Sequence, residues 1–134
     1  MNKPLDDSDI SQTVRTLILE RIDSVVQLEV LLLLYGSPDR ARTAQEVAQE
    51  LRIDASWAQG QLGELAARGL AAGEGNDAFR YAPSTPELNE AVAQMARDYA
   101  ERRVRIITLI FSKPVDKLRS FADAFRLRKD KPNG

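Results

Sequence analysis

Apolar residues recur every three or four positions along much of the chain, the spacing that places them on one face of a helix. The first such stretch, residues 14–22, predicts a short helix after a polar arm over residues 1–9. The next apolar stretch begins with a capping box at Ser24. It continues as VVQLEVLLLLY, residues 25–35, which is apolar on nearly every side. It predicts a buried central helix, followed by a turn over residues 37–42.

Two further helices are predicted by capping signals in the middle of the chain. Thr43 and Glu46 have capping-box spacing and open a short helix with a single apolar face. Ser56 and Gln59 repeat that spacing, so we expect them at the start of the next helix. Gly69 is placed to end this helix in the left-handed conformation.

The second half of the chain combines a hairpin pattern with longer helices. Alternating residues on either side of a turn at 73–77 predict two short strands. From Pro86 the apolar residues recur at helical spacing as far as Phe111, which predicts one helix of about seven turns. Pro114 disfavours helical geometry at the residue before it, so a separate last helix should follow.

Charge is unevenly distributed, although the net charge of the chain is only −1. Residues 97–134 contain eleven Lys or Arg against five Asp or Glu, which makes this segment +6. Residues 37–83 carry five Arg and seven Asp or Glu and sum to −2. The positive field therefore belongs to the C-terminal part of the chain.

Residue types exclude much enzyme chemistry. The chain has no Cys and no His, so thiol nucleophiles, imidazole bases, disulfides and the commonest zinc sites are ruled out. We find no catalytic constellation, metal cluster or cofactor motif, and we expect a protein that is not an enzyme. The absence of an apolar run long enough to span a membrane, and of a signal sequence, leads us to expect a cytoplasmic protein.

The order helix, short helix, turn, helix and hairpin resembles the winged helix-turn-helix family of bacterial transcription regulators, including those of the MarR type. The resemblance covers residues 24–83 and is most specific at LGELAARGL, where Leu62 and Leu65 precede Gly69 and Leu70. It implies a mainly α fold with a three-helix core and a small β-hairpin wing. We divide the chain accordingly into an N-terminal arm and short helix (1–23), the winged-helix domain (24–83), two C-terminal helices (84–127) and a basic tail (128–134).

The resemblance also implies binding of duplex DNA, with the third helix of the domain in the major groove. The residues at its outward positions that are suited to DNA are Ser56 and Gln59, since Gln pairs well with adenine. Phosphate contacts would have to come from five arginines: Arg40, Arg42, Arg52, Arg68 and Arg80. Few other positive charges are near, and the hairpin turn carries acidic residues, so the electrostatic term that usually dominates DNA affinity is small.

A protein-interaction module on the same scaffold is the alternative. Trp57, the only tryptophan, either packs against a neighbouring helix or stands exposed as an interface anchor, and we favour packing. Gly60 and Gly63 lie on one face of the same helix and would let another backbone approach closely. We favour tolerated drift as the origin of both glycines over a partner contact.

The C-terminal helices combine apolar residues with dense positive charge. Such helices commonly pair two subunits in this family, so we expect a homodimer, with fold-back onto the same chain as an equal alternative. Contact with a membrane surface or with nucleic acid is a weaker alternative. The expected dimer residues are Val104, Ile106, Ile107, Ile110, Phe111, Leu118, Phe121 and Phe125.

Overall fold

The structure, a computed structural model, describes residues 10–75 and 77–113 and is mainly helical, as the sequence predicts. Its helices are α2 (Gln12–Arg21), α3 (Val25–Tyr35), α4 (Ala44–Leu51), α5 (Ala55–Ala67), α6 (Pro86–Glu101) and α7 (Arg103–Phe111). Its strands are β1 (Arg42–Thr43), β2 (Ala71–Glu74) and β3 (Ala78–Tyr81). The polar arm, the last predicted helix and the basic tail lie outside the described residues.

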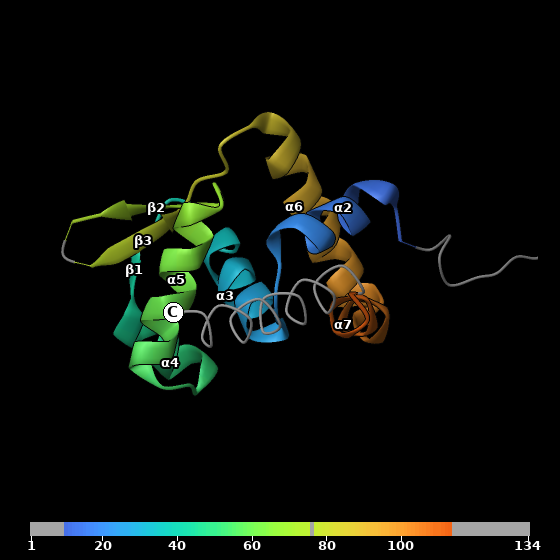
Figure 1. Cartoon of the computed structure of the whole chain (residues 1–134). Helices are drawn as coiled ribbons and strands as arrows, with labels where there is room; N and C mark the ends of the chain where they lie inside the picture. The colour runs from blue at the N-terminus through green and yellow to red at the C-terminus, as the bar shows by residue number, and fades with distance from the viewer. Residues whose placement is uncertain (1–9, 76, 114–134) are drawn as a thin grey trace, which may run out of the picture.

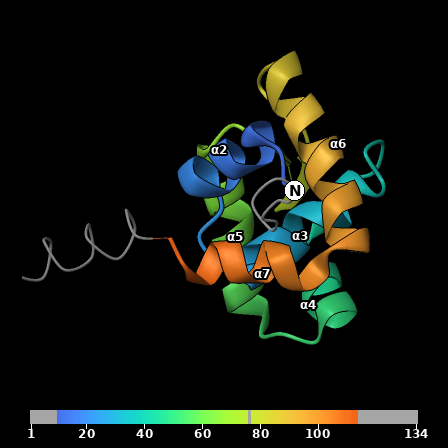
Figure 2. The same ribbon diagram turned by 90° about the vertical axis from the view of Figure 1, so that its right-hand side faces the viewer.

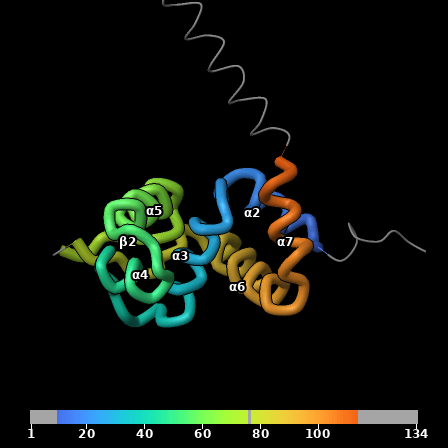
Figure 3. Tube along the Cα trace, turned by 90° about the horizontal axis from the view of Figure 1, so that it is seen from below, coloured from blue at the N-terminus to red at the C-terminus, as the bar shows by residue number. Residues whose placement is uncertain are grey.

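Helix α3 lies between two groups of elements (Figures 1 and 3). On one side are α4, α5 and the strands, and on the other are α2, α6 and α7. Leu28, Leu31 and Leu34 of α3 are fully buried, as are Leu62 and Leu65 of α5. Burying a leucine side chain stabilises the fold by about 1.5–3 kcal/mol. Because α3 is apolar on nearly every side, it can bury side chains against both groups of elements and forms the centre of the core.

Side-chain caps begin the helices at or near the predicted positions. Ser24 Oγ accepts a hydrogen bond from the amide of Gln27, and Thr43 and Glu46 form a reciprocal capping box. The prediction that Ser56 caps α5 was wrong by two residues, because Asp54 is the cap and accepts bonds from the amides of Ser56 and Trp57. The Ser56 hydroxyl also donates to this carboxylate. This bond and the two amide bonds lower the pKa of Asp54. A carboxylate is therefore held at the N-terminus of α5, where the helix dipole favours it.

The strands form an antiparallel sheet in the order β1-β3-β2, and the predicted hairpin is its β2–β3 part. Strand β1 lies partly in what the sequence predicted to be a turn. It has only two residues and is defined by its pairing with β3, so no local sequence pattern predicts it. Gly69 has φ +78°, and a Cβ there would lie 2.7 Å from Ser84 Oγ. This confirms the predicted left-handed end of α5.

The predicted seven-turn helix is broken at Arg102 into α6 and α7, and α7 crosses the end of α6 (Figure 2). The break lets α7 turn back to α2, so that Ile106 and Ile110 are buried in the core. A straight helix would carry both side chains into solvent.

A polar contact ties the break to α3. Tyr99 Oη donates to Glu29 Oε2 at 2.8 Å, and Arg103 donates to the same oxygen at 3.1 Å while lying over the Tyr99 ring. Burial and the neighbouring carboxylate raise the pKa of Tyr99 to about 12, so its hydroxyl remains a donor at neutral pH.

Asp23, in the link between α2 and α3, joins the two groups of elements. Arg68 Nη2, at the end of α5, donates to Asp23 Oδ2 at 2.6 Å. Lys113, just after α7, is buried, and its Nζ lies 2.6 Å from the Ile22 carbonyl oxygen and 3.4 Å from Asp23 Oδ1. Arg21 and Arg68 also exchange side chain-to-carbonyl bonds. Residues separated by 45 and 90 positions therefore meet at one carboxylate.

Replacing Asp23 with Asn should lower the free energy of unfolding by about 1–2 kcal/mol at neutral pH, because Arg68 and buried Lys113 lose their counter-charge. Urea unfolding followed by circular dichroism measures the change. Glu90→Gln, at an exposed carboxylate on α6, is the matched control and should change stability by less than about 0.5 kcal/mol.

The same comparison has a defined pH dependence. The hydrogen bond from Arg68 lowers the pKa of Asp23 below its usual value of 3.8. The carboxylate therefore stabilises the fold above the unfolded-state pKa, and the contribution is lost as pH falls through the lower folded-state value. The gap between wild type and Asp23→Asn should be constant from neutral pH to about pH 5, begin to narrow near about pH 4 and close only below the lowered folded-state pKa. A gap that persists unchanged in acid would contradict an electrostatic role.

Candidate binding surface on helix α5

Helix α5 presents one face to the core and the other to solvent. Ala58, Leu62 and Leu65 are buried, as their spacing predicts. The opposite positions are all exposed: Ser56, Trp57, Gln59, Gly60 and Gly63. We call these five residues the α5 surface. It carries no charged side chain, although Asp54 and Glu64 lie beside it.

Trp57 is only half-buried. Its exposed fraction is 49%, so the packing interpretation that we favoured from the sequence was wrong. A large aromatic side chain left in water is unfavourable by the area it exposes. Within the described part of the chain, about half of this residue stays uncovered.

Gly60 and Gly63 are not required by the packing of this chain. A Cβ built at either position meets no atom within 4 Å, and both residues have ordinary helical backbone. Each glycine destabilises the helix by about 1 kcal/mol relative to alanine. The two glycines make a low, flat strip beside Trp57.

Three of the five arginines predicted to contact phosphates are paired with carboxylates. Arg68 binds Asp23 and also lies 3.0 Å from Glu64, so it holds the fold together. Arg80 pairs with Glu74 across the hairpin. Arg40 forms a longer pair of 3.4 Å with Glu46, in which both side chains are largely exposed. Such a pair contributes little and is easily exchanged.

Arg42 and Arg52 have no carboxylate partner among the described residues. Arg42 donates to Ser37 Oγ at 3.2 Å, while its buried Nε makes no hydrogen bond. Arg52 is exposed and ends α4 in the left-handed conformation, with φ 60°. Sequence reasoning had no signal for this conformation, which is uncommon for a residue other than glycine.

Acidic residues line the two cavities that border α4. A cavity of about 350 Å³ contacts Arg40 and Arg42, but Glu46 and Glu50 also line it. A wider cavity of about 750 Å³ between α4 and α5 is bordered by Glu46 and Asp54. A phosphate at either place would meet a carboxylate as well as, or instead of, an arginine.

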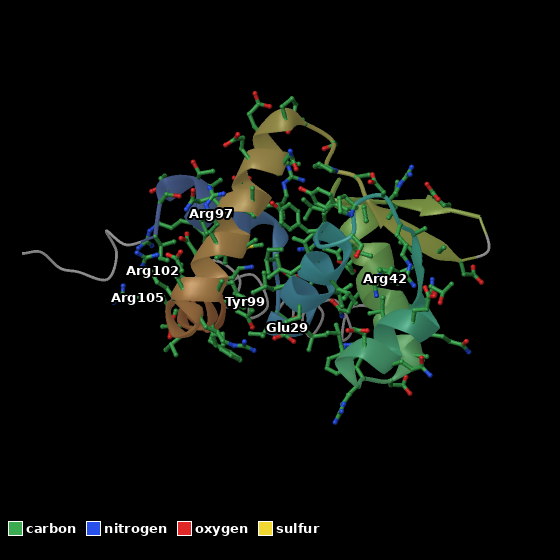
Figure 4. All side chains as sticks on the ribbon, turned by 180° about the vertical axis from the view of Figure 1, so that it is seen from behind. Glu29, Arg42, Arg97, Tyr99, Arg102 and Arg105 are labelled. Atoms are coloured by element: carbon green, nitrogen blue, oxygen red, sulfur yellow. The ribbon has the colours of Figure 1, made fainter. Side chains whose placement is uncertain are left out.

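A further group of arginines lies on α6 and α7. Arg97, Arg102 and Arg105 gather where α6 meets α7, and Arg42 lies at the other end of the molecule (Figure 4). Arg97, Arg102 and Arg105 therefore do not form one patch with Arg42.

The residues expected at a dimer contact differ in exposure: some are buried in their own chain and others face solvent. Ile106 and Ile110 are buried in the core of their own chain, so they are not available to a second subunit. Val104 and Phe111 are exposed by 76% and 68%, and Ile107 lies partly buried on the same edge of α7. Leu118, Phe121 and Phe125 lie outside the described residues.

The ion-pair partners are the site residues that sequence reasoning missed. Glu64 and Arg68 are four residues apart on a helix, a spacing that predicts their contact. Glu74 and Arg80 follow from the hairpin register, once that register is known. Asp23 is distant in sequence from Arg68, and no local pattern connects them.

Comparison with protein-family models, curated proteins and solved structures found no match. Within residues 10–75 and 77–113, no three His, Cys, Asp or Glu side chains are grouped so that they could hold a metal ion. Among the helices of the same residues, none has the length and apolar character needed to cross a membrane.

Proposed function

We propose that this chain is a protein-interaction module on a winged-helix scaffold and that the α5 surface is its docking face. The order α3, β1, α4, α5, β2, β3 is the element order of that fold, with α5 in the position of the recognition helix and β2–β3 as the wing. The assignment rests on this order and on the three-stranded sheet.

Half-exposed Trp57 is the observation that carries the proposal. Tryptophan is enriched among the residues that dominate binding energy at protein interfaces, where its ring fills a pocket of the partner. Ser56 and Gln59 supply hydrogen-bonding groups beside it, and the glycine strip lets a partner's backbone come close. The chemistry fits a partner with an apolar pocket and an uncharged polar rim.

Binding of duplex DNA as a homodimeric bacterial transcription regulator is the second candidate. It is favoured by the exposure of Ser56 and Gln59 on the face that would enter the major groove. Arg42, Arg52 and the weakly paired Arg40 would supply its phosphate contacts. The acidic residues around them oppose it, and this places it second.

Both candidates are non-catalytic, and we place the protein in the cytoplasm as part of the proposal. A homodimer would form through the outer edge of α7, at Val104, Ile107 and Phe111, because these residues are apolar and not part of the closed core. This edge is separate from the α5 surface, so dimer formation and docking can occur together.

Trp57→Ala should abolish capture of a specific partner while leaving the fold intact, because the side chain is half in water. Tagged wild type and variant, compared by quantitative mass spectrometry of co-purifying proteins, give the readout. Phe111→Ala is the matched control, since it also removes an exposed aromatic ring. A partner retained by Phe111→Ala and lost by Trp57→Ala is the expected result. Equal capture by all three proteins would reject the α5 surface as a docking face.

Binding to a mixed-sequence DNA duplex, titrated at several salt concentrations, separates the two candidates. The protein module should not bind even at low salt. A DNA reader using three arginines per chain would show a log–log slope of roughly −3 per subunit, which Arg42→Ala with Arg52→Ala would flatten by about 2. Such a slope would establish the second candidate in place of the first.

A further inference from the structure

An apolar groove lies between α2 and α7, away from the α5 surface. It encloses about 350 Å³, with Ile18, Leu19 and Leu109 forming its apolar part. The polar residues that line it are Gln12, Arg15, Ser112 and Lys113. Leu19 is exposed by 41%, which leaves a large apolar side chain uncovered by the described residues.

The chain leaves the described structure at the end of this groove. Lys113 lines the groove, and its position is fixed because its Nζ donates to the Ile22 carbonyl oxygen at 2.6 Å. Whatever follows Lys113 therefore starts beside Leu19 and its neighbours. Only Pro114 separates this point from the next apolar residue, Val115.

The following segment has the pattern needed to cover the groove. Val115, Leu118, Phe121, Ala122 and Phe125 fall on one face of the helix that the sequence predicts there. From Leu19 back to Gln12 the groove follows two turns of α2, about 10 Å at 1.5 Å per residue. Residues 115–122 span the same length in helical form.

We propose that residues 115–122 pack into the α2–α7 groove of their own chain. Helix α7 ends at Phe111, and Pro114 disfavours helical geometry at the residue before it, so a new helix can start in another direction. Connections of two to five residues commonly join antiparallel helices. The short tether also gives the segment an effective concentration of about millimolar at its own groove, which favours it over a second copy. The outer edge of α7 remains open, because Leu109 faces the groove while Val104 and Phe111 are solvent-exposed.

Because the chain has no cysteine, engineered disulfides test this packing directly in the full-length protein. Leu19→Cys combined with Leu118→Cys places a thiol on each apolar face. Leu19→Cys combined with Ser120→Cys is the matched control, since Ser120 lies on the opposite side of the predicted helix. Mild oxidation, a non-reducing gel and peptide mass spectrometry identify the bonds.

The first pair should form an intramolecular disulfide at least about tenfold faster than the control pair, at a rate independent of protein concentration. Disulfide-linked dimers in place of monomers would show that a second copy occupies the groove, and would overturn the proposal. Val115→Cys and Phe121→Cys, each combined with Leu19→Cys, cover a shifted register. If none of the three positions links within the chain faster than Ser120→Cys, the segment does not dock there.

Discussion

The arrangement of this protein depends on one carboxylate between two helices. Asp23 binds Arg68 at the end of α5 and buried Lys113 after α7, so the two groups of elements on either side of α3 are joined at its start. An unpaired buried ammonium group is costly, so Lys113 stays in place because it has both this carboxylate and the Ile22 carbonyl oxygen. The contact has two further effects: Arg68 is withdrawn from the α5 surface, and the chain exit is fixed beside the α2–α7 groove.

Pairing of this kind determines what the α5 surface can bind. Arg68 and Arg80 neutralise carboxylates within the chain, and Arg40 is paired more loosely, so little positive charge is left beside Ser56 and Gln59. The largest exposed group on the surface is instead the Trp57 ring. We therefore propose a protein contact on a scaffold that we propose to be a winged helix, because the fold sets the shape of the surface and the side chains set its chemistry.

Features that depend on neighbouring residues could be predicted from the sequence. The leucine stripe of α5, the Thr43–Glu46 capping box and the left-handed Gly69 are local, and each is confirmed. Ser56, Gln59, Gly60 and Gly63 were placed correctly on the outward side of α5, whereas Trp57 was expected to pack and is half-exposed. The break at Arg102 was missed, because it follows from the contact of α7 with α2 and leaves no Pro or Gly in the sequence. The pairing of Arg68 with Asp23 was also missed, because it too depends on residues far apart in the sequence. This pairing removes Arg68 from the predicted phosphate contacts.

Site-specific photo-crosslinking from position 57 tests the central claim most directly, namely that the α5 surface contacts a protein. A photoreactive tryptophan analogue, which keeps the indole ring that the proposal requires, would replace Trp57 in the full chain inside cells, with Glu90 as the exposed control position on α6. We predict a discrete protein adduct from position 57 that position 90 does not give, resistant to nuclease and lost on protease treatment. A nuclease-sensitive adduct from position 57, or the same protein adducts from both positions, would contradict this account.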